Sequence, residues 1–252
     1  MVTYNADTIV LKQFDLGEAD KIITFCSRER GQIRAVAKYA RKSGRFSGAL
    51  LPFTCNRITF YRGKSLDKIN HVENIYSFSP LRDDLKKMSY ASYMAETVKK
   101  VGVEDKSQSA LFSLLLGAFN KLISREESQY PGLNLIFKLK LLCITGHRPL
   151  LNYCVECGKK IEKKNNCFSI AAGGVVCREC TDGFEGEIFR IKEKAQQLMK
   201  KYINLEKLYP ENICVDYKII NDLNEFLDRF ILYHLDIHLK SLEFLNMIED
   251  FG

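Results

Sequence analysis

Four cysteines in the middle of the chain form two Cys-x-x-Cys pairs, and they constrain the fold more than any other feature of the sequence. The first pair is Cys154 and Cys157, and the second, after nineteen intervening residues, is Cys177 and Cys180. Each pair places two sulfur atoms on one tight turn, and a short hairpin brings the pairs together around a tetrahedral Zn²⁺. Because protein atoms fill all four positions, no water is activated. The sequence therefore predicts one structural zinc ion.

Disulfide bonds and buried thiols are the alternative interpretations of the cysteines. The chain has nine cysteines, an odd number, and its first residues, MVTYNADTIV, show no basic segment followed by an apolar one. We therefore expect a reducing, cytoplasmic environment, which disfavours disulfides. Five cysteines lie among apolar residues, as buried thiols do: Cys26, Cys55, Cys143, Cys167 and Cys214. Of these, Cys167 lies inside the zinc loop and is a candidate for an additional ligand.

The first third of the chain has a β pattern. Five strand-length segments are rich in Ile, Val, Thr, Phe and Tyr and are separated by turn signals: residues 8–14, 21–27, 32–38, 54–61 and 65–78. Five short antiparallel strands are typical of a small closed barrel such as the OB-fold. The connection after the third strand, YARKSGRFSGALLP (residues 39–52, the basic loop), is polar and basic, and we expect it to lie at the mouth of the barrel.

The remainder of the chain has a helical pattern, interrupted by the cysteine pairs. Apolar residues recur every three or four positions over residues 81–101, 107–123, 131–146, 192–202 and 219–249. Residues 152–181 are too few to form a core, so we expect metal coordination to supply their folding free energy, on the order of 10 kcal/mol. No apolar stretch reaches the roughly 20 residues of a membrane span, so we expect no membrane partner.

These patterns predict an α+β multi-domain protein. Residues 1–79 form an OB-fold nucleic-acid-binding β-barrel, residues 80–150 and 184–252 together form an α-helical domain, and residues 151–183 form a four-cysteine zinc module inserted into it. The length of 252 residues and the hydrophobic content of 46% are sufficient for cores of this size.

Positive charge is concentrated near the start of the chain. The formal net charge is +7, and residues 1–80 hold thirteen Lys and Arg against seven Asp and Glu. This surplus indicates a polyanionic partner, and the alternative is a solvated basic face without a ligand. Single-stranded nucleic acid uses cations and aromatic rings together, because cations neutralise phosphates while rings stack on bases. The candidate contacts are Arg34, Lys38, Tyr39, Arg41, Lys42, Arg45 and Phe46. For the two rings, the alternative is a core position at the barrel end.

Motifs of several enzyme classes are absent from the sequence. There is no Gly-x-x-x-x-Gly-Lys-Ser/Thr loop, no Gly-x-Gly-x-x-Gly turn and no Gly-x-Ser-x-Gly elbow, which argues against an NTPase, a dinucleotide enzyme and an α/β hydrolase. His234 and His238 lie one helical turn apart, but the first is not followed by the Glu of the His-Glu-x-x-His hydrolases. We therefore expect a protein that is not an enzyme.

The order of these features resembles the RecO family of bacterial DNA repair and recombination proteins. Three stretches carry the resemblance: TIVLKQFDLGEADKIITFCSRERGQIRAVAKYARK near the start, CVECGKK with CREC in the zinc module, and RFILYHLDIHLKSLEFL near the end. The resemblance implies a cytoplasmic, nucleoid-associated protein that binds single- and double-stranded DNA and anneals complementary strands. With the partner RecR, it would help to load RecA onto strands coated by the single-stranded-DNA-binding protein SSB, in the RecF pathway.

The resemblance also implies binding of the acidic, Phe-ended tail of SSB. For this tail we expect an apolar pocket rimmed by Lys or Arg in the helical domain, and Lys138, Lys140 and Arg148 are candidates. Some relatives lack the zinc cysteines, which implies that the metal is a scaffold. The alternative function is a zinc-ribbon adaptor that binds RNA or regulates transcription, and an undetected hydrolase is a third hypothesis.

Overall fold

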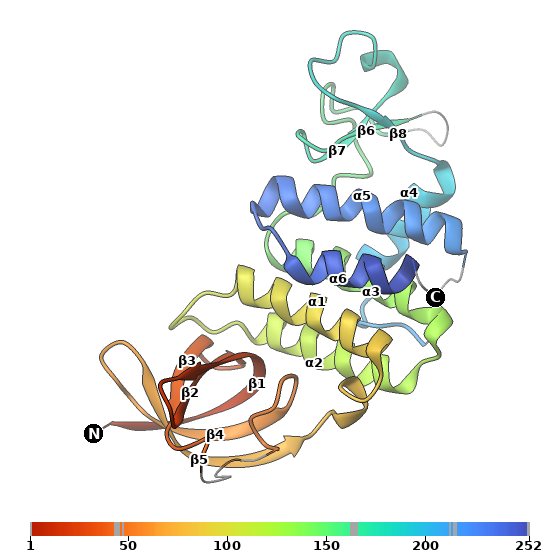
Figure 1. Ribbon diagram of the computed structural model, residues 1–252. Helices are drawn as coiled ribbons and strands as arrows, with labels where there is room; N and C mark the ends of the chain where they lie inside the picture. The colour runs from red at the N-terminus through yellow and green to blue at the C-terminus, as the bar shows by residue number, and fades with distance from the viewer. Residues whose placement is uncertain are drawn as a thin grey trace. The chain divides into compact units, whose positions relative to one another are not determined.

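The chain divides into two compact units. Figure 1 shows the computed structural model, which describes residues 2–42, 46, 48–161, 166–211, 213 and 216–250. The barrel unit comprises Met1–Arg125 with Leu239–Gly252, and the helical unit comprises Glu126–His238. The three-domain division expected from the sequence stays a prediction.

The barrel unit contains the predicted five-stranded barrel. Its strands, red to orange in Figure 1, are β1 (Thr3–Leu16), β2 (Asp20–Ser27), β3 (Gly31–Ala37), β4 (Cys55–Tyr61) and β5 (Asp67–Tyr76). The barrel closes in the order β1-β2-β3-β5-β4, with β3 and β5 parallel and the other neighbours antiparallel. The OB-type fold class is therefore confirmed.

The first strand is longer than the pattern indicated. The sequence predicts a strand over residues 8–14, whereas β1 begins at Thr3 and ends at Leu16. Its first half pairs with β4 and its second half with β2, so this one strand closes the barrel. Alternate residues point into a core that includes Val10, Phe25 and Phe60, as the two-residue period of a strand requires.

Three helices complete the barrel unit. They are α1 (Leu85–Val101), α2 (Ser109–Ser124) and α6 (Lys240–Asp250), and a short 3-10 turn (Ser79–Leu81) precedes them. Helix α1 packs against β1, β2, α2 and α6. The Glu96 carboxylate of α1 accepts hydrogen bonds from the backbone N–H and the hydroxyl of Ser241, at 2.8 and 2.6 Å, and thereby holds the start of α6.

The single helix predicted over residues 219–249 is wrong. Helix α5 (Tyr217–Leu235) ends at Asp236, whose φ is 50°, and α6 begins at Lys240 in the other unit. Aspartate tolerates this left-handed conformation better than most residues. Since leucines continue at helical spacing on both sides of the break, the periodicity alone does not reveal it.

The helical unit combines three helices with a small sheet. It contains a 3-10 turn (Glu127–Gln129), α3 (Tyr130–Ile144), α4 (Glu193–Ile203) and α5, and α3 packs against both other helices. Between α3 and α4 lie β6 (Cys167–Ser169), β7 (Gly174–Val176), a 3-10 turn (Arg178–Cys180) and β8 (Phe189–Arg190). The Phe168 ring of β6 lies 4.9 Å from the Phe226 ring and 5.9 Å from the Phe230 ring, which anchors the sheet on α5.

Candidate metal centre and nucleic-acid interface

The four cysteines of the two Cys-x-x-Cys pairs meet in space, as predicted. The sulfur atoms of Cys154, Cys157, Cys177 and Cys180 all lie within 4.8 Å of one another, and those of Cys157 and Cys177 are 3.7 Å apart. A tetrahedron of sulfurs at the usual Zn–S bond length has edges of about 3.8 Å. The cluster therefore fits a tetrahedral metal ion, and its all-sulfur donor set is the one that structural zinc sites use.

Backbone hydrogen bonds shape the two turns that carry the sulfurs. Gly158 N–H donates to the Cys154 carbonyl at 3.0 Å, and Cys180 N–H donates to the Cys177 carbonyl at 3.0 Å. Lys159 of the first turn pairs with Glu179 of the second at 2.6 Å. Local hydrogen bonds thus define each turn, and an exposed ion pair joins the two turns.

The electrostatics of the cluster favour thiolate formation at Cys154. Burial acts to raise the pKa of this thiol, but hydrogen bonds, chiefly from the backbone N–H groups of Cys157, Cys177 and Glu156, outweigh it and lower the pKa to about 6. A thiolate is the form of cysteine that binds a metal. The candidate additional ligand, Cys167, lies in β6 and is not a member of the cluster in the described part of the chain, and Cys214 lies outside the described residues.

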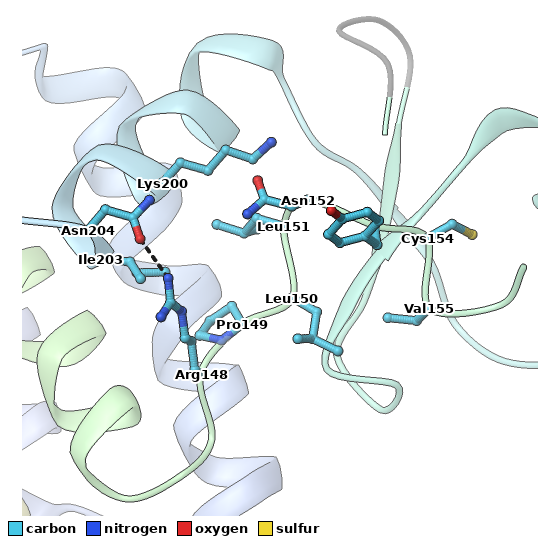
Figure 2. Close-up of a pocket in the computed structure, with 11 residues that line it drawn as sticks. Arg148, Pro149, Leu150, Leu151, Asn152, Cys154, Val155, Lys200, Ile203 and Asn204 are labelled. Atoms are coloured by element: carbon cyan, nitrogen blue, oxygen red, sulfur yellow. Dashed lines mark hydrogen bonds between the residues drawn. The ribbon is translucent and has the colours of Figure 1, made fainter. Parts of the chain in front are cut away.

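An apolar groove of about 280 Å³ borders the metal centre (Figure 2). Pro149, Leu150 and Ile203 form part of its apolar lining, and Cys154 and Val155 belong to the first metal turn. Two cations, Arg148 and Lys200, also line it, and none of its described lining residues is acidic.

Neither of these two cations pairs with a carboxylate of the groove's described lining. Arg148 donates to the neutral Asn204 side chain at 2.6 Å, a contact that Figure 2 shows. Partial burial and, secondly, the positive charge of Lys160 lower the pKa of Lys200. Among its described residues, the groove therefore offers two cations and no carboxylate beside an apolar surface, which suits a ligand that combines carboxylates with an apolar group.

Two of the three candidate cations for this pocket are wrong. The Lys138 side chain is 1% exposed and pairs with Asp228 at 2.7 Å. Lys140 is also buried, and its ammonium donates to the carbonyls of Leu205 and Ile203 at 2.6 and 3.3 Å. Because helix α3 is buried along nearly its whole length, its lysines bind partners inside the protein and do not reach a surface. Arg148, which follows α3, is the candidate that lines the groove.

The basic loop and the strand before it place the candidate nucleic-acid contacts in different environments. Arg34 and Lys38 are exposed, and Tyr39, with φ 59°, is 58% exposed. Arg41 lies 3.3 Å from Asp15 at the end of β1, and Lys42 lies 3.3 Å from Glu18 in the β1–β2 turn, so both cations are partly neutralised. Phe46 packs against the barrel core, as the core interpretation expected. Arg45 lies outside the described residues.

The fold also gathers cations that the sequence analysis did not single out. Lys12 of β1 and Arg34 of β3 both stand opposite Thr24 of β2, so they share one row on the outer face of the barrel. Burial is the main cause that lowers the pKa of Lys99 in α1, and the charges of Lys12, Lys100 and Arg34 lower it further, whereas the charge of Glu96 acts to raise it. We call Lys12, Arg34, Lys99 and Lys100 the basic cluster. No signal in the sequence could have found it, since Lys99 and Lys100 lie at a helix C-terminus, where lysines are common.

Two family models match the chain, and their boundary lies directly after the strands of the barrel rather than at the boundary of the two compact units. The sequence profile described as "Recombination protein O N terminal" matches residues 1–78, and "Recombination protein O C terminal" matches residues 82–243.

None of the helices in the described residues has the length and apolar character that a membrane crossing requires.

Individual relatives match over nearly their full length. A protein of Symbiobacterium thermophilum named DNA repair protein RecO is 34% identical over 251 residues, which cover 98% of either chain. Proteins of the same name from Pelotomaculum thermopropionicum and Gloeobacter violaceus are 33% and 32% identical, over 98% and 97% of this chain and 94% and 93% of theirs. This chain therefore belongs to the RecO family of DNA repair proteins.

Proposed function

We propose that the chain is a mediator of DNA repair and homologous recombination. It binds single- and double-stranded DNA, anneals complementary strands and, with RecR, helps to load RecA onto SSB-coated strands. It makes and breaks no covalent bond. Family membership supports this function, and one structural observation carries the DNA-binding step: Lys12, Arg34, Lys38, Lys99 and Lys100 are cations on one unit, and no ion pair joins them to an acidic residue within the described residues.

Annealing requires a surface that neutralises two phosphate backbones while the base edges stay accessible. Cations that are not held in ion pairs can do this, because each phosphate contact releases a condensed counterion. If these five cations contact single-stranded DNA, the slope of log K against log salt is about −3.5. In this proposal, Tyr39, Arg41 and Lys42 of the basic loop extend this surface, and the exposed ion pairs of Arg41 and Lys42 are weak enough to exchange for phosphates. Arg45 stays a predicted contact, and Phe46 packs against the barrel core.

We propose zinc as the metal of the cysteine cluster, with a structural role. One Zn²⁺ held by Cys154, Cys157, Cys177 and Cys180 would fix the first metal turn and with it one wall of the apolar groove. All four ligands come from the protein, so the ion has no open position for a substrate.

The apolar groove is proposed as the site for the acidic, Phe-ended tail of SSB. The charge complementarity of Arg148 and Lys200 supports this, as does the apolar lining that a terminal Phe requires. A fluorescent peptide with this sequence character tests the site. We expect the double variant Arg148→Ala/Lys200→Ala to bind it about tenfold more weakly, and the control Lys194→Ala, an exposed lysine of α4, to bind it unchanged. If the Arg148→Ala/Lys200→Ala variant binds the peptide as tightly as the Lys194→Ala control does, the tail binds to another surface.

Fluorescence-detected annealing of two complementary oligonucleotides, with and without SSB, tests the proposed function. The first variant carries Lys38→Ala, Arg41→Ala, Lys42→Ala and Arg45→Ala, and the second carries Lys12→Ala, Arg34→Ala and Lys99→Ala. A matched control removes three exposed lysines from the helical unit: Lys194, Lys201 and Lys218.

We expect the intact protein and the control to accelerate annealing, and both barrel-unit variants to lose most of the acceleration. Zinc content and circular dichroism check that every variant is folded. A folded, zinc-loaded wild type that binds RNA but leaves the annealing rate unchanged would contradict the proposal and favour the adaptor function instead.

A further inference from the structure

A second, strongly polar pocket of about 200 Å³ lies in the barrel unit, away from the basic loop. Its lining includes four cations: Arg30, Arg34, Arg62 and Lys64. Three acidic residues, Asp67, Glu104 and Asp105, also line it. Asp67 is already used within the fold, because its carboxylate accepts hydrogen bonds from the Tyr4 hydroxyl and from Gly63 N–H.

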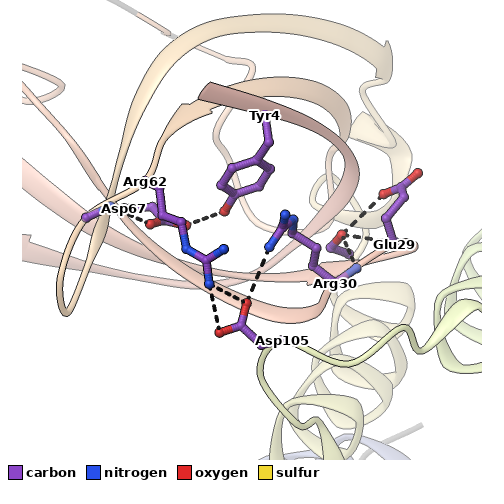
Figure 3. A network of polar contacts seen from close by, with 8 residues as sticks. Tyr4, Glu29, Arg30, Arg62, Asp67 and Asp105 are labelled. Atoms are coloured by element: carbon purple, nitrogen blue, oxygen red, sulfur yellow. Dashed lines mark hydrogen bonds and ion pairs between the residues drawn. The ribbon is translucent and has the colours of Figure 1, made fainter. Parts of the chain in front are cut away.

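Two arginines of this pocket converge on one carboxylate (Figure 3). Arg30 Nη1 lies 3.4 Å from Asp105 Oδ1, and Arg62 Nη2 lies 3.4 and 3.5 Å from the two oxygens of Asp105. The Arg30 guanidinium also stacks over the Tyr4 ring at 4.2 Å, which holds it in place. The pocket thus presents two guanidinium groups, at least one of them fixed, to a single anionic group.

The backbone that carries Asp105 is fastened to the barrel. Gln32 N–H donates to the Val103 carbonyl at 2.9 Å, and the Ser107 hydroxyl donates to the Arg28 carbonyl at 3.2 Å. The approach at Gly31 is so close that a Cβ there would lie 2.2 Å from the Val103 carbonyl oxygen. The Asp105 side chain, by contrast, is 69% exposed. Its carboxylate can therefore leave the arginines by a change of rotamer alone.

We propose that this pocket is a subsite for a phosphate group of the nucleic-acid backbone, and that Asp105 takes the place of that phosphate when nucleic acid is absent. The inference rests on the proposed function and deepens it. Guanidinium forks bind carboxylates and phosphates with the same geometry. The pairs of Asp105 are exposed and long, so they are weak, whereas a backbone phosphate brings the added gain of counterion release.

Arg34 connects this subsite with the proposed DNA surface. It lines the pocket and also belongs to the basic cluster with Lys12 and Lys99. A strand bound on the cluster therefore has a phosphate within reach of the pocket without crossing an uncharged surface. This continuity favours a nucleic-acid backbone over an isolated phosphate ion as the natural ligand.

Removal of the competing carboxylate is the sharpest test. Asp105→Asn removes the charge and keeps the shape, and asparagine accepts the left-handed φ of 54° at this position. Glu73→Gln is the matched control, because it removes one exposed carboxylate from β5 without touching the pocket. Arg62→Gln removes one of the two guanidinium groups of the subsite. Fluorescence anisotropy with an oligodeoxythymidylate of about 12 nucleotides, over a series of salt concentrations, measures each affinity.

We expect Asp105→Asn to bind the oligonucleotide about fivefold more tightly than wild type, and Glu73→Gln to differ less than about twofold. Arg62→Gln should bind more weakly, with a slope of log K against log salt that is shallower by about 0.7. Equal affinities for Asp105→Asn and Glu73→Gln would overturn the inference, and so would an unchanged salt slope in Arg62→Gln.

Inorganic phosphate, added alone, distinguishes the two sources of the ligand. We expect it to compete with the oligonucleotide only weakly. If it binds wild type as tightly as the oligonucleotide does, the backbone subsite is overturned. If the annealing variant that carries Lys38→Ala, Arg41→Ala, Lys42→Ala and Arg45→Ala loses DNA binding while the Asp105 and Arg62 variants behave as wild type, the inference fails and the proposed function stands. If wild type neither binds nor anneals DNA, the proposed function itself fails.

Discussion

The buried ion pair of Lys138 and Asp228 gives a quantitative prediction for the stability of the helical unit. Lys138 Nζ lies 2.7 Å from Asp228 Oδ1 and 3.1 Å from the Asn224 carbonyl, on a side chain that is 1% exposed. At an effective dielectric constant of about 20, the Coulomb attraction at this distance is about 6 kcal/mol. Loss of hydration costs several kcal/mol per buried ion and offsets most of that attraction.

Breaking this pair should therefore cost more than the pair contributes. Lys138→Met leaves the Asp228 carboxylate, 17% exposed, without its cation, and we expect the free energy of unfolding to fall by about 3–5 kcal/mol. The double variant Lys138→Met/Asp228→Asn removes both charges of the pair, so it should be more stable than Lys138→Met alone, by about 2 kcal/mol.

Urea unfolding of the zinc-loaded protein measures these differences. Arg229→Met is the matched control, because Arg229 pairs with Glu225 at a similar 2.6 Å on the same helix, but the two side chains are 59% and 71% exposed. This variant should lose less than about 1 kcal/mol. A loss for Lys138→Met no larger than for Arg229→Met would refute the argument from burial, and so would purely additive effects in the double variant.

Three further changes test the metal centre, the packing beneath Asp105 and a helix cap. Metal removal by a chelator, or Cys157→Ser, should speed amide hydrogen exchange in both metal turns. It should also weaken binding of the acidic peptide, because Cys154 belongs to the metal cluster and lines the apolar groove. Unchanged exchange would argue against a structural metal. Gly31→Ala should lower the urea-unfolding free energy by about 3 kcal/mol, because its φ is +68° and its Cβ would overlap the Val103 carbonyl. Asp84→Ala should cost about 1 kcal/mol at neutral pH, because the Asp84 carboxylate caps α1 through Lys87 N–H. This same hydrogen bond lowers the pKa of Asp84 below its usual 3.8, so in urea titrations the cost should be full above that pH and shrink as the pH falls below it.

Features set by neighbouring residues were predictable from the sequence. The cysteine pairs define their own turns, and the metal cluster formed as their spacing indicated. Likewise, alternating apolar residues mark the strands that close the barrel. The break at Asp236 was not predictable in this way, because helical periodicity reports which face is buried and not where the backbone turns.

Features set by tertiary packing escaped the sequence analysis. Lys138 and Lys140 look like surface cations in a list of residues, yet they lie in a helix whose apolar neighbours leave no polar face, as in LIFKLKLL. A lysine in such a run needs a buried partner, and this was the signal available. The basic cluster gave no such signal, because residues almost ninety positions apart, Lys12 and Lys99, meet only in the fold.

The cations of the barrel unit that are proposed as DNA contacts fall into two groups, and the difference bears on how a mediator would hold DNA. Arg41, Lys42, Arg30 and Arg62 lie beside exposed carboxylates, whereas the basic cluster has no ion pair within the described residues. In the proposed function, the basic cluster attracts the strand first, and the paired cations then exchange a carboxylate for a phosphate at little cost. Each exchange is also easily reversed, because the carboxylate stays tethered beside its cation. Such a surface binds a strand without trapping it, which annealing requires, because the paired product must leave.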